Sequence, residues 1–462
     1  MMSNNEPTIT DGNNLINASP TKDFFIYMLV KDIDLTSAVS DLVDNSIDGA
    51  KNLRESSRYD DLFVKISVTA EHFEITDNCG GIDVETAKNY AFRFGRSSGS
   101  PLLDYSVGRF GVGMKRAIFK MGTIFRIESI TENSKFVLEK DIEEWARQQD
   151  ETGKEKWDFS FTSLDLNYRL TEGEYPGTKI RVSNLYEGVS DEFSLEDYRT
   201  RLRQDLTSDH QLAMQKGMRI YLNDSPLIAP VIQLAKSEKI TPAYESLTKD
   251  NGDVTIKVYA GLTKPSDPKA RLEPSEAGWN VFCNERLVLK ADQSSRTGWG
   301  KLINRNPSFH NDYSLFRGYT FFESQNPNLL PWNTTKNGID EDSPTYRSVR
   351  QEMAKMMKPV ITFLRQLAKE RRSKEDDMEL SPLEQILFES DSLPLSEITE
   401  RHKFEVINEG REEEQKEIFK NIQYSKPEAE VNKVQDVLGV KTLKEVGERT
   451  FEYFLEMECE EE

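Results

Sequence analysis

Apolar residues recur at helical spacing near the start of the chain. Val39, Val43, Ile47 and Ala50 are separated by four, four and three positions, which predicts an amphipathic helix over Leu35–Ser56. Runs typical of strands follow it at Leu62–Val68, Phe73–Thr76, Thr123–Ser129, Lys135–Leu138 and Thr178–Val182. Strands mixed with inserted helices favour an α+β sandwich over a regular alternation of strand and helix.

A second unit is expected over residues 191–374. Strands are predicted near Met218–Leu222, Val254–Ala260 and Trp279–Cys283, and a long basic helix, Thr345–Arg372, closes it. Residues 1–20 are polar and predict an arm, which leaves residues 21–190 as the first domain. Residues 375–462 are expected to form an acidic linker and a mostly helical terminal segment.

Charge is distributed unevenly along the chain. Of the net charge of -20, residues 375–462 carry -16, whereas residues 286–374 carry +8. A basic middle region favours a polyanionic partner, and the overall acidity argues against one. Solvated helix faces explain the basic residues equally well.

No long apolar run and no leader-like pattern is present in these 462 residues, so a cytoplasmic protein without a membrane span is expected. The cysteines Cys79, Cys283 and Cys459 are odd in number and far apart, which argues against a disulfide framework.

A second face of the first helix is acidic. Asp41, Asn45 and Asp48 stand at positions i, i+4 and i+7. Carboxylate and amide oxygens suit a hard cation such as Mg²⁺, which shares them with substrate phosphates. Solvent-facing acids on an amphipathic helix are the more common explanation of such a face taken alone.

Glycine-rich motifs follow in order. Asp77 ends a strand and is followed by Asn78-Cys79-Gly80-Gly81-Ile82, where a carboxylate can accept a hydrogen bond from an adenine amino group. An ordinary turn after a strand is the alternative. The sequence Gly108-Arg109-Phe110-Gly111-Val112-Gly113-Met114-Lys115 enters a predicted helix, where backbone N–H groups can bind phosphate and Lys115 can add a charge. Gly177-Thr178 then begins a strand, and the hydroxyl of Thr178 can support Asp77.

Together these motifs resemble the GHKL, or Bergerat-fold, ATPase superfamily of DNA gyrase B subunits, ninety-kilodalton heat-shock chaperones, histidine kinases and MutL. SDLVDNSIDGA resembles its N-box, DNCGGI its Asp-x-Gly-x-Gly motif, GRFGVGMK its lid and GTKI its final element. The resemblance implies a mixed sheet with helices on one face, binding ATP with Mg²⁺. It assigns the metal to Asn45 and general-base catalysis to Asp41. It assigns ATP contacts to Asn45, Asp48, Asp77, Gly81, Ile82, Gly108, Gly111, Val112, Gly113, Lys115 and Thr178.

Two positions depart from the family pattern. Asp41 stands where the family has a longer Glu, so ATP binding is expected to be firmer than hydrolysis, which needs contact with the attacking water. Cys79 replaces a glycine, which puts the geometry of that turn in question.

The second unit resembles the transducer domain of gyrase, MutL and, most closely, MORC-type ATPases. FCNERLVLK and LPWNTTKNGID carry this likeness, which implies that Lys336 reaches the γ-phosphate as a second catalytic residue. A surface lysine in a turn is the alternative.

The resemblance implies a clamp in which ATP pairs two copies of the chain on DNA or a nucleoprotein complex. A chaperone-like module acting on a protein partner through the acidic tail, or a nucleotide-sensing pseudo-ATPase, are the alternatives. At the end of the chain, a predicted strand at Asn421–Ser425 and two helices loosely resemble a ribbon-helix-helix module. A dimerising or partner-docking hairpin explains this segment equally well.

Overall fold

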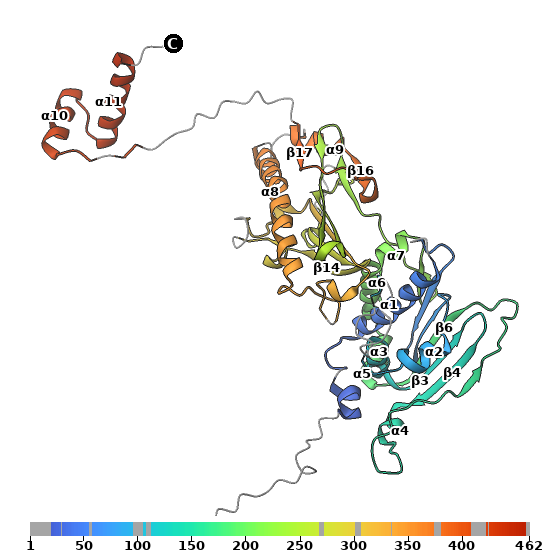
Figure 1. The fold of residues 1–462 in the computed structure, drawn as a ribbon. Helices are drawn as coiled ribbons and strands as arrows, with labels where there is room; N and C mark the ends of the chain where they lie inside the picture. Colours follow the sequence, from blue (N-terminus) through green and yellow to red (C-terminus); the bar gives the residue numbers. More distant parts are fainter. Residues whose placement is uncertain are drawn as a thin grey trace, which may run out of the picture. The chain divides into compact units, whose positions relative to one another are not determined.

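The computed structural model describes residues 20–28, 30–54, 58–95, 105–107, 112–267, 272–300, 306–333, 335–373, 380–407, 422–423 and 425–458. The chain forms two compact units, Met1–Ile407 and Asn408–Glu462. The larger unit contains both main sheets (Figure 1).

The first sheet has eight strands in the order β5-β4-β3-β6-β2-β1-β7-β8. β1 pairs with β7 in parallel and every other neighbouring pair is antiparallel, so the sheet is mixed. The strands are β1 (Phe63–Val68), β2 (His72–Asp77), β3 (Gly122–Ile130), β4 (Lys135–Asp141), β5 (Ser163–Asp165), β6 (Gly177–Leu185), β7 (Arg219–Leu222) and β8 (Ser225–Pro226).

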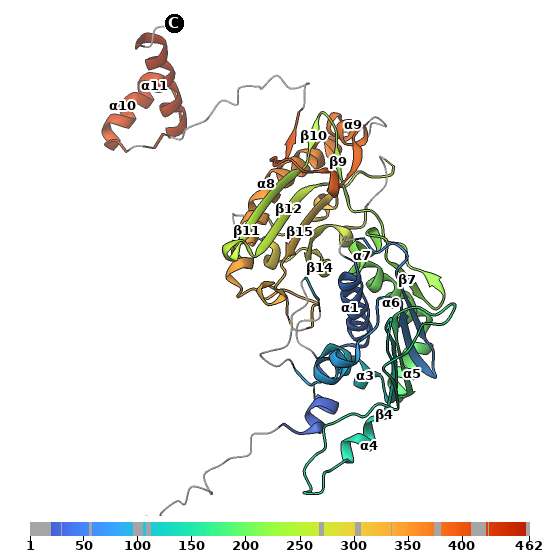
Figure 2. The same ribbon diagram turned by 45° about the vertical axis from the view of Figure 1, so that its right-hand side comes forward.

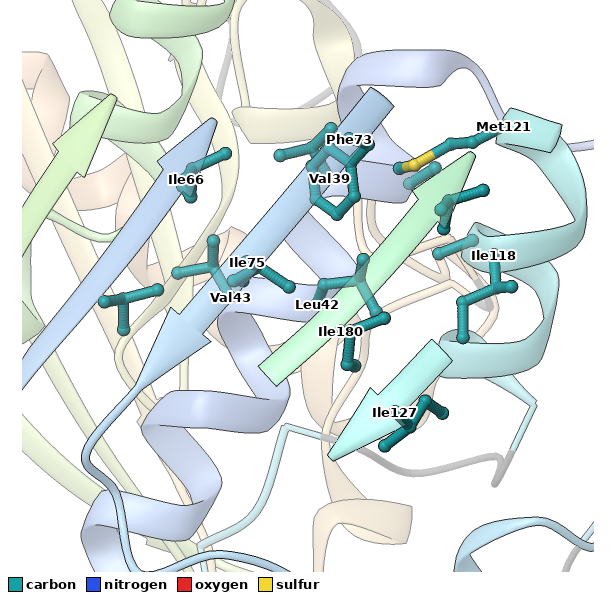
Figure 3. Packing of buried hydrophobic residues seen from close by; sticks show 14 of the residues in the cluster. Val39, Leu42, Val43, Ile66, Phe73, Ile75, Ile118, Met121, Ile127 and Ile180 are labelled. Atoms are coloured by element: carbon teal, nitrogen blue, oxygen red, sulfur yellow. The ribbon is translucent and has the colours of Figure 1, made fainter. Parts of the chain in front are cut away.

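Helices cover one face of this sheet. The helical segments of this region are η1 (Phe24–Met28), α1 (Leu35–Leu53), α2 (Val84–Thr86), η2 (Ala87–Ala91), α3 (Gly113–Met121), α4 (Ile142–Arg147), α5 (Glu187–Ser194), α6 (Glu196–Asp209) and α7 (Gln211–Gln215). Along β1 and β2 buried side chains alternate with more exposed ones, as in a sheet with one covered face. Figure 3 shows the apolar side chains of α1 and α3 packed against this face, among them Val39, Val43 and Ile118. The expected fold class, an α+β sandwich followed by further α/β and helical regions, is confirmed.

The first core extends beyond the boundary expected at residue 190. Phe193 and Leu206, together with residues of β7 and Leu227, belong to the same buried cluster as α1. The short parallel pairing of β7 with β1 explains the difference, because a strand far along the chain completes the sheet at that edge.

The second sheet has five strands in the order β11-β12-β15-β13-β14. They are β11 (Ala243–Lys249), β12 (Val254–Leu262), β13 (Gly278–Cys283), β14 (Arg286–Asp292) and β15 (Phe316–Glu323). Helix α8 (Pro344–Ser373) packs on β12 and β15 (Figure 2). Short 3-10 turns connect these elements at Asp250–Gly252, Pro274–Glu276, Ser295–Thr297, Asn311–Tyr313 and Pro327–Leu329.

Residues 380–407 fold onto this second domain, although the sequence predicted a linker there. The segment contains α9 (Pro382–Phe388), which begins with a capping box at Ser381, and a 3-10 turn, Leu395–Glu397. β16 (Asp391–Pro394) pairs with β9 (Gln233–Lys236), and β17 (Glu405–Val406) pairs with β10 (Ile240–Thr241). The second domain therefore extends beyond residue 374, and the compact unit that contains it ends at Ile407.

The smaller unit is a pair of helices, α10 (Glu428–Leu438) and α11 (Leu443–Glu458). Gly439, at φ 64°, ends α10 in the left-handed conformation that favours glycine. Ile422, Gln423 and Ser425 lie outside any strand, and the remainder of the predicted strand Asn421–Ser425 falls outside the described residues.

None of the helices in the described part of the chain combines the length and apolar character that a membrane crossing requires.

Candidate functional site

Helix α1 positions the acidic residues. Asp34 caps its first turn by accepting a hydrogen bond from the Ser37 amide, and its apolar face fixes its rotation on the sheet. Asn45 is exposed, whereas Asp41 and Asp48 are buried. The three residues predicted to share one face therefore have different environments, because neighbouring segments cover both ends of that face.

Asp77 lies at the end of β2 and receives three hydrogen bonds. Its Oδ2 accepts from Ser46 Oγ at 2.7 Å, and its Oδ1 accepts from the amides of Cys79 at 2.9 Å and Thr178 at 3.2 Å. Burial raises the pKa of Asp77, and these donors act against that rise. The predicted support from Thr178 therefore comes from its backbone amide. Ser46, which sequence reasoning missed, follows Asn45 directly in α1 and turns toward β2.

The turn after Asp77 depends on Gly81. At φ +73° it approaches the carbonyl of Ile130 so closely that a Cβ would lie 2.1 Å from that oxygen. Gly80 also has a positive φ, whereas Cys79 is not among the residues with positive φ. The family's glycine at position 79 is therefore not needed for this backbone. Ile82 donates its amide to Ser129 Oγ at 2.7 Å, which holds the other end of the turn.

The lid motif is described only from Val112 onward, and Gly108 and Gly111 lie outside the described residues. Gly113 begins α3 against α1, since a Cβ there would lie 3.2 Å from Asp41 Oδ2. Lys115, predicted to face phosphate, is buried and donates from Nζ to the carbonyl of Ala91 at 2.9 Å. Asp48, predicted to contact ATP, accepts the Val107 amide with both carboxylate oxygens, at 2.8 and 2.9 Å.

Lys336 comes from the second domain and lies against α1. Its Nζ donates to Asp41 Oδ1 at 2.9 Å and to Asp44 Oδ2 at 2.8 Å. The residue is 6% exposed and adopts φ 56°, a conformation that non-glycine residues rarely adopt. Burial acts to lower the pKa of Lys336, but Asp41 and Asp44 outweigh it and raise the pKa above its ordinary value. The surface-lysine alternative is therefore wrong.

Asp41, the expected base, is enclosed by two cations. Besides Lys336, the guanidinium of Arg116 on α3 lies 3.0 Å from its Oδ2. Base catalysis needs an open lone pair facing water, and here each carboxylate oxygen already binds a cation. Arg116 was missed from the sequence, although it directly follows the lid lysine.

Asp44 is the most buried acid of α1, and sequence reasoning did not select it. Its Oδ1 faces Arg286 Nε at 3.4 Å and His210 Nδ1 at 3.6 Å, while Oδ2 binds Lys336. Burial acts to raise the pKa of Asp44, but Lys336, Arg286 and His210 outweigh it and lower the pKa to about 2. Burial, with a smaller effect of Arg286, lowers the pKa of His210 to about 4. The sequence did contain a signal for a buried acid. Asp41, Asp44 and Asp48 lie within eight residues of one amphipathic helix, whose exposed face is too narrow for all three.

Arg286 stands at the base of the β13–β14 hairpin. The two turn residues, Asn284 at φ 45° and Glu285 at φ 76°, give a two-residue turn of the type that matches strand twist. Glu285 accepts from Tyr59 Oη at 3.0 Å and pairs with Lys216. The motif that suggested a transducer therefore docks directly on the first domain.

Comparison with protein families supports the GHKL resemblance of the first domain. Residues 33–166 match the family model for histidine kinase-, DNA gyrase B- and HSP90-like ATPases. This GHKL-type match contains α1, the Asp77 turn and the described part of the lid. A search of curated proteins finds no match. The matched region ends before the second domain, so the likeness of that domain to MORC or MutL proteins stays a prediction.

The residues present fit the nucleotide that the GHKL type implies. Asp77 Oδ2 accepts one hydrogen bond from the described residues and so retains a lone pair for an amino group. Gly81 fixes the turn that follows Asp77, because only a residue without a side chain fits against the Ile130 carbonyl there. Exposed Asn45 offers an amide oxygen, and Mg²⁺ is commonly held by few protein ligands together with phosphate oxygens.

Proposed function

We propose that this chain is a Mg²⁺-dependent ATPase in which the second domain senses the γ-phosphate through Lys336. The observation that carries the proposal is the placement of Lys336 Nζ on Asp41 and Asp44, within the helix that also presents Asn45. A cation from another domain at this place links the nucleotide site to the position of that domain. Magnesium held by Asn45 would neutralise phosphate charge during transfer.

Hydrolysis in this proposal is slow and requires a rearrangement. Asp41 becomes able to accept a proton from water when Lys336 leaves its Oδ1. Phosphate groups offer Lys336 a competing anion, so nucleotide binding favours the rearrangement. The residues assigned from the resemblance, including Gly108 and Gly111, remain part of the proposal.

We further propose that the rearrangement pairs two copies of the chain into a clamp on DNA or a nucleoprotein complex, as the MORC-type likeness implies. The basic region 286–374, with a net charge of +8, supports a polyanionic client. Light scattering with a non-hydrolysable ATP analogue tests the pairing. Doubling of the mass supports the clamp, and an unchanged monomer contradicts it.

Turnover assays separate the ATPase from a nucleotide sensor. We expect Asn45→Ala and Lys336→Ala to abolish DNA-stimulated turnover, whereas Asn167→Ala, at an exposed position, leaves it unchanged. Equal basal turnover in all four proteins, with nucleotide still bound, supports sensing without catalysis. Failure of the folded wild type to bind adenine nucleotide in calorimetry contradicts the whole proposal.

A protein client is the second candidate, and the terminal helices favour it. Val437, Leu443 and Phe454 expose 81%, 71% and 57% of their surface. Exposed apolar side chains on adjacent helices are typical of a docking surface. Salt-dependent binding to DNA separates this candidate from the clamp, since counterion release is specific to the polyanion.

A further inference from the structure

Two cations from the second domain face the two oxygens of one carboxylate. Lys336 binds Asp44 Oδ2 at 2.8 Å, and Arg286 Nε lies 3.4 Å from Asp44 Oδ1. Neither Arg286 Nε nor Asp44 Oδ1 makes a hydrogen bond among the described residues. Arg286 also holds Asp209, with its Nη1 2.7 Å from Asp209 Oδ2. A small approach of Arg286 therefore completes a hydrogen bond to Asp44.

The two cations are anchored differently. Arg286 follows the hairpin turn that is fixed to the first domain, where Asn284 donates to the carbonyl of Ser106 at 3.4 Å and accepts at its own carbonyl from Lys51 at 3.3 Å. Lys336 is carried by a turn in which Asn337 Oδ1 accepts hydrogen bonds from the side chains of Asn333 and Thr335. The backbone beside Arg286 is thus held on the first domain, so that its side chain has only a short distance to move toward Asp44, and Lys336 is the cation that can leave.

The departure of Lys336 would leave a buried anion. Removing one partner from a buried ion pair is unfavourable because the remaining charge is neither hydrated nor neutralised. Asp44 is 1% exposed, so water does not reach it easily. His210, the third neighbour, has its pKa lowered to about 4 and is neutral near pH 7. Arg286 is then the charged group adjacent to Asp44.

A cavity beside the cluster gives these side chains room to move. Its volume is about 630 Å³, and it lies between the start of α1, helix α6 and strand β14. Lys336, Arg286 and Asp209 all line it.

We propose that Arg286 is a positioning residue that neutralises Asp44 when Lys336 transfers to the γ-phosphate, and that it thereby sets the preference of the protein for ATP over ADP. This inference rests on the proposed function of Lys336. ADP lacks the γ-phosphate, so its binding does not require Lys336 to leave Asp44.

Calorimetry with Mg²⁺ and either ADP or a non-hydrolysable ATP analogue tests the inference on the full chain. We expect Arg286→Met to weaken analogue binding roughly tenfold, a typical coupling between sites, and to leave the Kd for ADP unchanged. Arg286→Lys should restore part of the loss. Lys290→Met removes a charge from an exposed position of the same strand and should change neither Kd.

A double-mutant cycle identifies Asp44 as the group through which Arg286 acts. In an Asp44→Asn background, where no buried charge remains at that position, Arg286→Met should no longer alter the ratio of the two Kd values. Thermal melts establish that each variant is folded. If Arg286→Met does not fold, Arg286→Lys takes its place in the cycle.

Several outcomes overturn the inference. If Arg286→Met weakened the binding of both nucleotides equally, Arg286 would have a general role in shaping the first domain. An undiminished effect in the Asp44→Asn background would show that Arg286 acts through Asp209. A wild type that binds ADP and the analogue equally well would remove the preference itself. A folded wild type that binds neither nucleotide would instead refute the proposed function.

Discussion

Two buried carboxylates lie at helix α1: Asp44 belongs to the helix, and Asp77 is hydrogen-bonded to it through Ser46. Their neighbours are of opposite kinds. Asp77 is surrounded by neutral donors from the first domain: the Ser46 hydroxyl and the amides of Cys79 and Thr178. Asp44 is surrounded by charged or ionisable groups, and two of these, Lys336 and Arg286, come from the second domain. Burial alone raises a carboxyl pKa. The pKa of Asp77 is indeed raised, whereas the cations lower that of Asp44 to about 2.

Under the proposed function, the difference corresponds to distinct tasks of the two sites. The Asp77 site is complete within one domain, so it can recognise the edge of a base without rearrangement. The Asp44 site depends on cations from elsewhere, so it changes when those cations find another anion. A fixed recognition site beside an exchangeable electrostatic site is what a nucleotide-gated protein requires.

The largest expected effect concerns the stability of the electrostatic site. Asp44→Ala leaves Lys336 and Arg286 without their shared carboxylate, and we expect the free energy of unfolding to fall by about 3–5 kcal/mol. Urea unfolding followed by circular dichroism measures the change. Asp197→Ala removes an acid whose side chain is 81% exposed and should have little effect. Equal, small losses in both variants would show that the buried cluster adds no stability.

A pH series tests the electrostatic site around Asp44 next. The pKa of His210 is about 4 in the folded protein, below its ordinary 6.5, so between these values the unfolded chain binds a proton that the folded chain does not. The free energy of unfolding therefore has its full value above pH 6.5 and falls by roughly 3 kcal/mol as the pH decreases from 6.5 to about 4. The Asp44 contribution is lost at lower pH, as pH falls from about 4 toward 2.

Replacing the histidine should remove the first of these two steps. We expect His210→Gln to flatten the stability curve between pH 6.5 and 4 in denaturant titrations, whereas His310→Gln, at an exposed position, keeps the slope. A slope that persists in His210→Gln would place the titrating group elsewhere.

The contrast between the sites also explains what the sequence was able to predict. Local patterns were sufficient for α1, for the strands around Asp77 and for the helix that became α8, because each depends on periodicity and on neighbouring residues. The order of the motifs suggested the ATPase resemblance, and residues 33–166 match that family. The positive φ at Gly80 and Gly81 agrees with a glycine-rich turn.

Partners distant in the sequence were not predictable in the same way. Asp44 meets Arg286 and Lys336 across more than two hundred residues, and no spacing rule encodes such a contact. β7 joins the first sheet for the same reason, through a parallel pairing with β1. The Lys336 position was suggested only by resemblance, and its actual carboxylate partners were found in the structure.

Measurements of nucleotide affinity should also distinguish the Asp77 site from the Asp44 site. Asp77→Asn places an amide where three donors converge, so we expect the affinities for ADP and for a non-hydrolysable ATP analogue to fall together by roughly 10–100-fold. Lys336→Met should weaken the analogue alone. Asp165→Asn, on an exposed strand, is the matched control in calorimetry. If Asp77→Asn spared ADP, the two sites would not have the separate tasks described above.

The smallest expected effect concerns Cys79, where the chain departs from the family pattern. Its side chain is 3% exposed and φ is not positive there, so Cys79→Gly removes buried apolar surface and adds backbone freedom without relieving strain. We expect the free energy of unfolding to fall by about 1 kcal/mol and the nucleotide affinity to stay the same. Gly80→Ala, at φ +96° and with its nearest neighbour a Leu53 methyl at 3.6 Å, should also destabilise, through backbone strain. Stabilisation by Cys79→Gly in denaturant unfolding would mean that the turn favours a left-handed residue at position 79, and that Cys79 strains the backbone beside Asp77.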